Sequence, residues 1–115
     1  MENIDDKSCP FCNVDSDRII ESNEHCLVFR DQYPVTKLHA LIIPKRHVKD
    51  YFDLNKDELA AINALILSQR IAVIGEDSTV EGFNIGINCG ETAGQTIFHC
   101  HVHLIPRRNG DVDNP

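Results

Sequence analysis

Three histidines stand at alternate positions in the stretch HCHVHLIP, residues 99–106, which ends in a proline. Side chains at positions i, i+2 and i+4 share one face of a β-strand, whereas a helix spreads them around its axis. The pattern therefore predicts a strand over residues 96–106, with His99, His101 and His103 on one face. The residues between them would point into the core, and these are Cys100, Val102 and Leu104.

Four further segments have the branched, apolar or alternating character of β-strands. They are residues 18–22, 25–31, 37–44 and 82–88. The first two would form a hairpin, because only Asn23 and Glu24 separate their apolar runs.

One long helix is predicted in the segment NKDELAAINALILSQRIAVIGE, residues 55–76. Asn55 can cap its N-terminus, Glu58 can complete a capping box, and Gly75 can end it. The residues that follow helical spacing are Leu59, Ile62, Leu65, Ile66, Gln69 and Val73. Short connections make successive strands antiparallel, so we expect an α+β domain with the helix packed on one face of the sheet.

Composition limits the classes of partner and compartment. The 115 residues carry a formal net charge of −7 and show no linker or repeat, so we expect one domain with a polar tail over residues 107–115. Without a basic stripe, the chain is not expected to bind a nucleic-acid polymer, although it can hold one small anion. The start MENIDDKSCP is not a secretory signal, and no run approaches the roughly 18 apolar residues of a membrane span. An odd count of five cysteines favours the reducing cytoplasm.

A CxxC motif formed by Cys9 and Cys12 has the spacing of a zinc knuckle. Tetrahedral zinc would need two more ligands, for which His47 and one histidine of the 99–103 run are candidates. Alternate Cα atoms on a strand are about 6 to 7 Å apart, so three histidines along a straight strand can hardly share one catalytic metal. A redox pair remains an alternative reading of the CxxC motif.

The loop NCGETAGQ, residues 88–95, leads directly into the histidine run. Gly90 and Gly94 permit backbone conformations that other residues avoid. Backbone N–H groups around Gly94, Gln95 and Thr96, together with the Thr96 hydroxyl, have the chemistry to bind phosphate oxygens. A plain hairpin loop is the alternative.

With these residues in view, the sequence resembles the histidine triad (HIT) family, whose pattern is His-φ-His-φ-His-φ-φ with φ hydrophobic. Residues 99–105, HCHVHLI, match it, and the segments NCGETAGQTIFH and CLVFRDQYPVTKLHALIIPKRH resemble its phosphate and nucleotide segments. The likeness covers residues 9–106. It implies a five-stranded antiparallel sheet, one long helix, a short N-terminal helical segment, and a homodimer whose sheets join into one of ten strands.

The resemblance also implies a nucleotidyl hydrolase or transferase, acting on purine nucleoside phosphoramidates or dinucleoside polyphosphates. His101 would attack the α-phosphorus and form a covalent nucleotidyl-histidine, with His103 and His39 assisting. The remaining nucleotide-site positions carried over by the likeness are Phe29 at the base, Asp31 at the ribose, and Asn88, Gly94, Gln95 and Thr96 at the phosphates.

Family members with the N-terminal CxxC bind structural zinc, and by position the implied ligands are Cys9, Cys12, His47 and His99. This set would leave His101 and His103 for phosphate. Two other readings stay open: a nucleotide-binding regulatory module with little turnover, and a metal hydrolase that uses the HxH motif as catalytic ligands.

Overall fold

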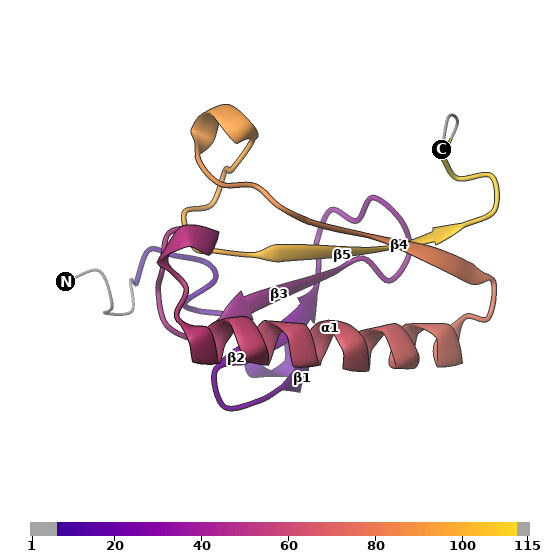
Figure 1. The fold of residues 1–115 in the computed structure, drawn as a ribbon, viewed down its shortest axis with the longest axis horizontal. Coiled ribbons are helices and arrows are strands. Elements are labelled where there is room, and N and C mark those ends of the chain that lie inside the picture. The colour runs from indigo at the N-terminus through magenta and orange to yellow at the C-terminus, as the bar shows by residue number, and fades with distance from the viewer. Residues whose placement is uncertain (1–6, 113–115) are drawn as a thin grey trace.

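The computed structural model describes residues 7–112, and it contains one antiparallel sheet with strand order β1-β2-β3-β5-β4. The strands are β1 (Ile19–Ser22), β2 (Cys26–Arg30), β3 (Ala40–Pro44), β4 (Val80–Ile87) and β5 (Val102–Arg108). The long helix is α1 (Lys56–Glu76), and three 3-10 turns are η1 (Ser16–Arg18), η2 (Tyr51–Asp53) and η3 (Glu91–Ala93). The expected α+β fold is confirmed, and η1 is its short N-terminal helical segment (Figure 1).

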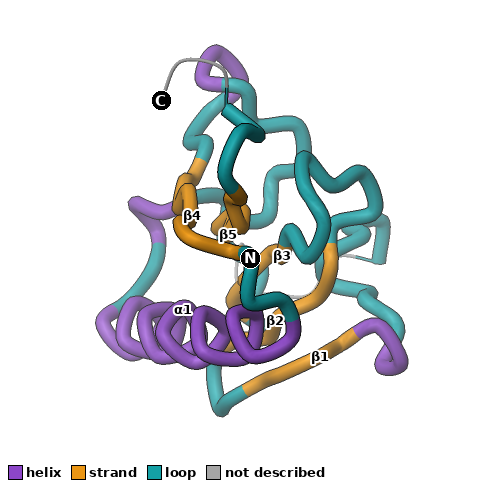
Figure 2. Tube along the Cα trace, turned by 90° about the vertical axis from the view of Figure 1, so that its right-hand side faces the viewer, coloured by secondary structure: helices purple, strands orange, loops and turns teal. Residues whose placement is uncertain are grey.

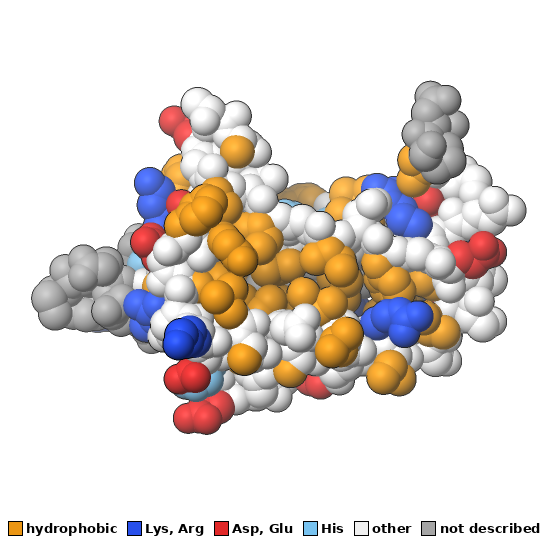
Figure 3. Space-filling model, viewed as in Figure 1, with side chains coloured by type: hydrophobic (Ala, Val, Ile, Leu, Met, Phe, Trp, Pro, Cys, Tyr) orange, Lys and Arg blue, Asp and Glu red, His pale blue; other side chains and the backbone are white. Residues whose placement is uncertain are grey.

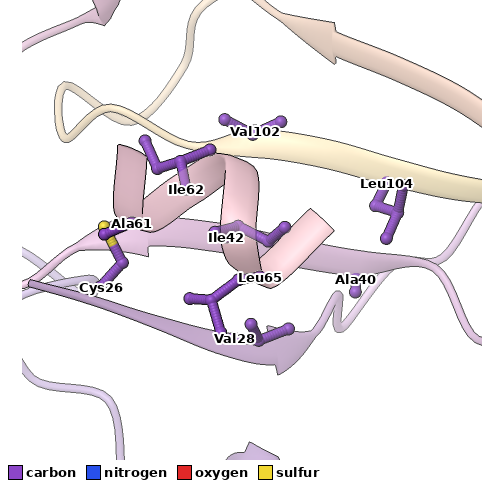
Figure 4. Close-up of a cluster of buried hydrophobic side chains, with 9 residues drawn as sticks. All are labelled: Cys26, Val28, Ala40, Ile42, Ala61, Ile62, Leu65, Val102 and Leu104. Carbon is purple, nitrogen blue, oxygen red and sulfur yellow. The ribbon is translucent and has the colours of Figure 1, made fainter. Parts of the chain in front are cut away.

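The main core lies between α1 and one face of the sheet, while loops gather on the other face (Figure 2). Ala61, Ile62 and Leu65 of α1 pack on the sheet. The sheet side chains of this cluster are Cys26, Val28, Ala40, Ile42, Val102 and Leu104, shown in Figure 4. Full burial of one such Val, Leu or Ile stabilises the fold by about 1.5–3 kcal/mol, so this layer fixes β5 beneath the helix.

The predicted capping box at the start of α1 is confirmed. The Asn55 side chain accepts from Glu58 N at 2.8 Å, and the Glu58 carboxylate accepts from Asn55 N at 3.0 Å. Arg46, just beyond β3, donates to the same buried carboxylate at 2.8 and 2.9 Å. The helix continues one residue past Gly75, because Asp77 N still donates to Val73 O.

The outer surface of α1 is unusually apolar. Leu59, expected on the sheet side, is exposed, as are Leu67 and Ile71 (57% and 71%), and Figure 3 shows hydrophobic side chains gathered along this side of the molecule. An 18-residue window of α1 has a mean hydropathy of 1.4, so by length and composition it is apolar enough to cross a membrane. The expectation that no segment reaches this measure was wrong, although here α1 is the core helix of a compact globular fold.

The histidine segment departs from the predicted strand over residues 96–106. β5 begins only at Val102, so His103 lies in the strand while His99 and His101 precede it. The cause is tertiary: Cys100 N donates to Val48 O at 2.8 Å rather than to a neighbouring strand. At its other end β5 runs through Arg107 and Arg108, which were expected in a loose tail; residues 113–115 of that tail lie outside the described residues.

Two other strand boundaries also differ from prediction. β3 begins at Ala40 rather than at residue 37, because Leu38 has a φ of 75°, which interrupts the extended chain. β4 covers Val80–Ile87 rather than residues 82–88.

Candidate active site

The candidate site lies on the sheet face opposite α1. Pairing places Phe29 beside Leu41 and Leu41 beside His103, so these three side chains share that face. The ring of His101 lies 5.2 Å from that of His103, and the His39 ring from β3's leading end lies 5.2 Å from His103 on another side. Three of the predicted site histidines therefore form one cluster.

The backbone fixes the tautomer of His101. Its Nδ1 lies 2.8 Å from the carbonyl oxygen of His99, which can only accept a hydrogen bond. Nδ1 must therefore carry the proton, and in the neutral ring Nε2 has a free lone pair. The ring is buried, with 7% of its surface exposed, so this orientation is held by packing as well.

A second set of bonds fixes His39 and His103. Val35 N donates to His39 Nδ1 at 3.0 Å, so His39 carries its proton on Nε2. That Nε2 lies 3.0 Å from His103 Nδ1, which must accept, and so His103 carries its proton on Nε2. His101 and His103 thus present complementary nitrogens: a lone pair on one, an N–H donor on the other.

Burial keeps the second pair uncharged. Desolvation is the main cause that lowers the pKa of His39, with Arg107 lowering it further and Asp31 opposing both. Desolvation also lowers the pKa of His103, reinforced by His101 and His39. Both rings are therefore held in the neutral form near pH 7.

Asp31 lies where two pockets meet. One of its oxygens accepts from Tyr33 N at 2.9 Å, and the other lies 3.5 Å from His39 Nε2. The larger pocket, of about 410 Å³, is lined by Asp31, His39, His103, Asn84 and Asn88 together with apolar residues of β4 and β5. Asn88 and Asp31, both predicted site residues, thus lie at this pocket with the histidines.

The smaller pocket, of about 210 Å³, is lined mainly by apolar and aromatic side chains and also includes Asp31 and Arg18. Phe29 forms part of its wall, as predicted, and at 1% exposure it also belongs to a small core cluster with Leu41 and Ile43. Arg18 stacks over the Phe29 ring, with its guanidinium carbon 5.1 Å from the centroid. An apolar pocket that ends at a carboxylate has the shape needed for a flat base attached to a hydroxylated sugar.

The buried side chain of Gln95 stabilises the glycine loop, residues 88–95, through hydrogen bonds to backbone groups. Gln95 is 2% exposed; its side-chain oxygen accepts from Gly90 N at 2.8 Å, and its nitrogen donates to Lys49 O and Ile97 O. Gly94 has a φ of 96°, and a Cβ there would lie 3.5 Å from the Asn88 amide. The Gly94 and Gln95 N–H groups bond within the loop, to Glu91 O and Gly90 O. Gln95 therefore shapes the loop rather than offering a free side chain to a ligand.

Thr96 is exposed and lies at a third pocket, of about 250 Å³, whose wall includes Cys9 and His47. It is the one residue of the predicted phosphate loop that lies at this pocket. The pocket opens onto the cysteine–histidine cluster described next.

The four residues predicted to bind metal come together. The donor atoms of Cys9, Cys12, His47 and His99 all lie within 4.8 Å of one another. Cys12 Sγ is 3.1 Å from His47 Nδ1 and 3.5 Å from His99 Nδ1, and Cys9 Sγ is 3.5 Å from His99 Nδ1. Ideal zinc bond lengths and tetrahedral angles place sulfur and nitrogen ligands about 3.5 Å apart, so the donor set fits zinc.

His99 is oriented toward this cluster by a backbone carbonyl. Its Nε2 lies 2.8 Å from Pro44 O, so Nε2 carries the proton and Nδ1 offers its lone pair to the thiolates' side. The first histidine of the run therefore directs Nδ1 into the cysteine–histidine cluster. His103 lines the larger pocket, and the buried His101 ring contacts both His103 and Phe11.

A second group, Asp31, His39 and His103, also brings donor atoms within 4.8 Å of one another. The Val35 N–H bond requires the proton of His39 to sit on Nε2, which is the atom that faces the group. A metal there would have to displace that proton and break the Val35 bond. At Asp31, His39 and His103 the geometry therefore favours a hydrogen-bonded chain over a bound metal.

Several contributors had no signal in the sequence. Val35 acts through its backbone N–H, which bonds His39. Arg18, in η1, acts by stacking on the Phe29 ring, which lies on β2. Phe11 lies inside the CxxC motif, and its ring contacts both Phe29 and His101. Its position between two predicted metal ligands was the only available indication.

Comparisons with known proteins show the family and support the fold. The family model described as HIT domain matches residues 13–110. The Bacillus subtilis protein named Protein hit is 36% identical over 105 residues, covering 88% of this chain and 72% of that protein. A Zn-bound histidine triad family protein from Mycobacterium smegmatis is 41% identical with a TM-score of 0.77, covering 90% and 78%. A hypothetical histidine triad nucleotide-binding protein from Sulfolobus tokodaii is 32% identical with a TM-score of 0.75, covering 89% and 70%.

Proposed function

This chain belongs to the HIT domain family, and on that premise we propose that it is a nucleotidyl hydrolase or transferase whose nucleophile is His101. Its substrates are purine nucleoside phosphoramidates or dinucleoside polyphosphates. The single observation that carries the proposal is the 2.8 Å bond from His101 Nδ1 to His99 O. It leaves Nε2 with a lone pair, on a ring that contacts Phe11 and His103, which line the two pockets, and that is not among the metal donors.

The reaction proceeds in two displacements. His101 Nε2 forms a bond to the α-phosphorus while the bond from phosphorus to the leaving group breaks. Water, or another acceptor, then attacks the same phosphorus, and the bond to Nε2 breaks to restore the ring. Over the whole hydrolysis, one proton of the water ends on the leaving group and the other stays with the acidic phosphate product. Covalent catalysis of this kind replaces one difficult displacement by two easier ones.

His103 stabilises the charge that develops during both displacements. Its Nε2–H donates to a phosphoryl or leaving-group atom, and His39 holds that tautomer through the 3.0 Å bond to Nδ1. Val35 N holds His39 in turn. The chain therefore presents an N–H donor to the phosphate while both of its histidine rings stay neutral.

The two pockets that meet at Asp31 bind different parts of the substrate. The small apolar pocket with Phe29 takes the base, the Asp31 carboxylate accepts from the ribose hydroxyls, and Asn88 lies on the phosphate side. The loop held by Gln95, including Gly94 and Thr96, borders the phosphates, and its N–H groups would have to exchange their internal bonds for phosphate oxygens.

Zinc is the metal that fits Cys9, Cys12, His47 and His99, with a structural role. When bound, zinc would link the N-terminal turn, through Cys9 and Cys12, to the segment before β5, through His99. His99, as a ligand, would hold the carbonyl that fixes the tautomer of its neighbour His101.

A homodimer and a cytoplasmic location complete the proposal. β4 is an edge strand, and its Ile85 is 57% exposed near the apolar outer surface of α1. Pairing of β4 with a second copy would join two five-stranded sheets and cover this surface, which single soluble chains rarely leave open.

A substrate panel tests the proposed activity. Release of AMP from adenosine phosphoramidates and from diadenosine polyphosphates is measured with and without added phosphate, for the wild type and for His101→Ala. The proposal expects turnover of at least one substrate class and its loss in the variant. Binding of AMP without any turnover by the wild type would favour the regulatory module instead.

A further inference from the structure

Phe11 lies within the turn that supplies both cysteines of the metal cluster. Cys12 N donates to Cys9 O at 3.2 Å, and the Asn13 amide donates to the same oxygen at 2.7 Å. The backbone that carries Phe11 is therefore held between Cys9 and Cys12. The thiols of these two cysteines lie 3.1 to 3.5 Å from His47 or His99.

The ring of Phe11 has three aromatic neighbours, each in edge-on geometry. Its centroid is 5.3 Å from that of Phe29, 5.1 Å from that of His101 and 6.1 Å from that of His99. It also lines the small apolar pocket. One side chain thus touches the proposed base pocket, the proposed nucleophile and a proposed metal ligand.

We propose that Phe11 couples the Cys9–Cys12–His47–His99 cluster to the nucleotide site, so that zinc binding and nucleotide binding strengthen each other. The inference rests on the proposed function and adds regulation of that site. Four donors that hold a metal fix the turn between Cys9 and Cys12, and this places the Phe11 ring against the pocket. Without the metal, only sulfur–nitrogen contacts of 3.1 to 3.5 Å link the turn to His47 and His99, and these are weaker than metal–ligand bonds.

The expected size of the coupling follows from the contacts. An aromatic pair of this geometry changes an equilibrium constant by about two- to twelvefold beyond burial alone. Two such contacts, to Phe29 and His101, depend on the position of Phe11. Coupling between two binding sites is reciprocal, so AMP must raise zinc affinity by the same factor by which zinc raises AMP affinity.

The decisive experiment is a thermodynamic cycle measured by calorimetry. AMP affinity is determined for the zinc-loaded and the chelator-treated protein, in the wild type and in Phe11→Ala and Phe11→Leu. Zinc removal is expected to weaken AMP binding about tenfold in the wild type, but less than about twofold in Phe11→Ala. Phe11→Leu, which retains bulk but no ring, is expected to lie between them. Phe52→Ala removes an exposed ring elsewhere and is expected to behave as the wild type.

An equal loss of AMP affinity on zinc removal in the wild type and Phe11→Ala would overturn the proposal, as would no loss in the wild type. If the zinc-free protein does not fold, zinc extraction by a chelator is timed with the loaded proteins instead. AMP is then expected to slow extraction in the wild type and not in Phe11→Ala, and equal slowing would contradict the coupling.

A readout without nucleotide separates this inference from the proposed function. The carbon-bound protons of the His101 ring lie near Phe11 and report its position through their NMR shifts. They are expected to move on zinc removal in the wild type and to move less in Phe11→Ala, where only the path through His99 O remains. Failure of the loaded wild type to bind AMP would reject the proposed function, whereas unmoved His101 shifts in the wild type would reject the coupling.

Discussion

His39 Nε2 lies 3.0 Å from His103 Nδ1, and this one bond determines which nitrogen of His103 faces the pocket with a proton. The donor that sets it is Val35 N, 3.0 Å from His39 Nδ1. A backbone amide therefore controls, through two rings, the hydrogen-bonding character of the site. The arrangement explains why His39, 64 residues before His103 in the sequence, belongs to the same site.

Replacement of His39 by alanine tests this chain. The variant frees His103 to adopt the wrong tautomer, so kcat is expected to fall by about tenfold or more, while KM for the nucleotide changes little. Steady-state kinetics with a phosphoramidate substrate provides the measurement. His25→Ala removes a histidine at the β1–β2 turn and is the matched control. Wild-type kcat in His39→Ala would remove His39 from the mechanism.

Stability is expected to fall as the pH drops below 6.5. The pKa values of His39 and His103 are lowered in the folded protein from the ordinary value of 6.5, chiefly by burial. The unfolded chain therefore binds more protons below that pH, and the stability present above it is lost as the pH approaches the lowered values. Asp31 opposes the shift and Arg107 and His101 add to it.

Urea unfolding at a series of pH values between 5 and 8 measures this effect. The wild type is expected to lose free energy of unfolding toward acid, and His39→Gln is expected to show a shallower dependence. The comparison is made at constant zinc, since metal binding by cysteine and histidine side chains depends on pH. Equal slopes for the two proteins would show that burial of His39 does not contribute.

Gln95→Ala is expected to destabilise the fold by about 2–4 kcal/mol, because it removes three hydrogen bonds from a buried side chain. It should also raise KM, since the loop from Gly90 to Thr96 loses its brace. Thr96→Val, at an exposed position in the same loop, is expected to change stability by no more than about 0.5 kcal/mol. A Gln95→Ala loss as small as that of the control would mean that the loop holds its shape unaided.

Ile85→Lys tests the proposed dimer. A charge on the edge strand β4 blocks pairing with a second copy, so the variant is expected to sediment as a monomer where the wild type is a dimer. Phe52→Lys, at an exposed ring in η2, is expected to leave the wild-type mass unchanged. A monomeric wild type at the same concentration would remove the dimer from the account.

Local signals predicted much of the fold. The capping box of Asn55 and Glu58 depends on residues three apart, and the strand–helix order follows from periodicity, so both were visible in the sequence. The extent of β5 was not, because it depends on Cys100 N bonding to Val48 O, a contact between distant segments. The late start of β3 was not predictable either. Leu38 has a φ of 75°, a conformation that usually marks a glycine, and the sequence has a leucine there.

The candidate site was predictable in its side chains but not in its backbone. The residue types at Cys9, Cys12, His47 and His99 indicated metal ligands, and the structure brings their donor atoms together. Three backbone groups, the amide of Val35 and the carbonyls of His99 and Pro44, fix the histidine tautomers. Every residue type has such groups, so the sequence cannot indicate which of them will bond a histidine. The sequence also predicted no role for the Gln95 side chain, because its partners are three backbone groups.

Direct capture of the covalent intermediate tests the central claim most sharply. The wild type is mixed with an adenosine phosphoramidate, quenched within milliseconds in neutral denaturant, digested, and analysed by mass spectrometry. The account predicts one adenylyl group on His101, attached through nitrogen, and no adduct in His101→Ala. Adenylylation of a different residue, or undiminished turnover by His101→Ala, would contradict it.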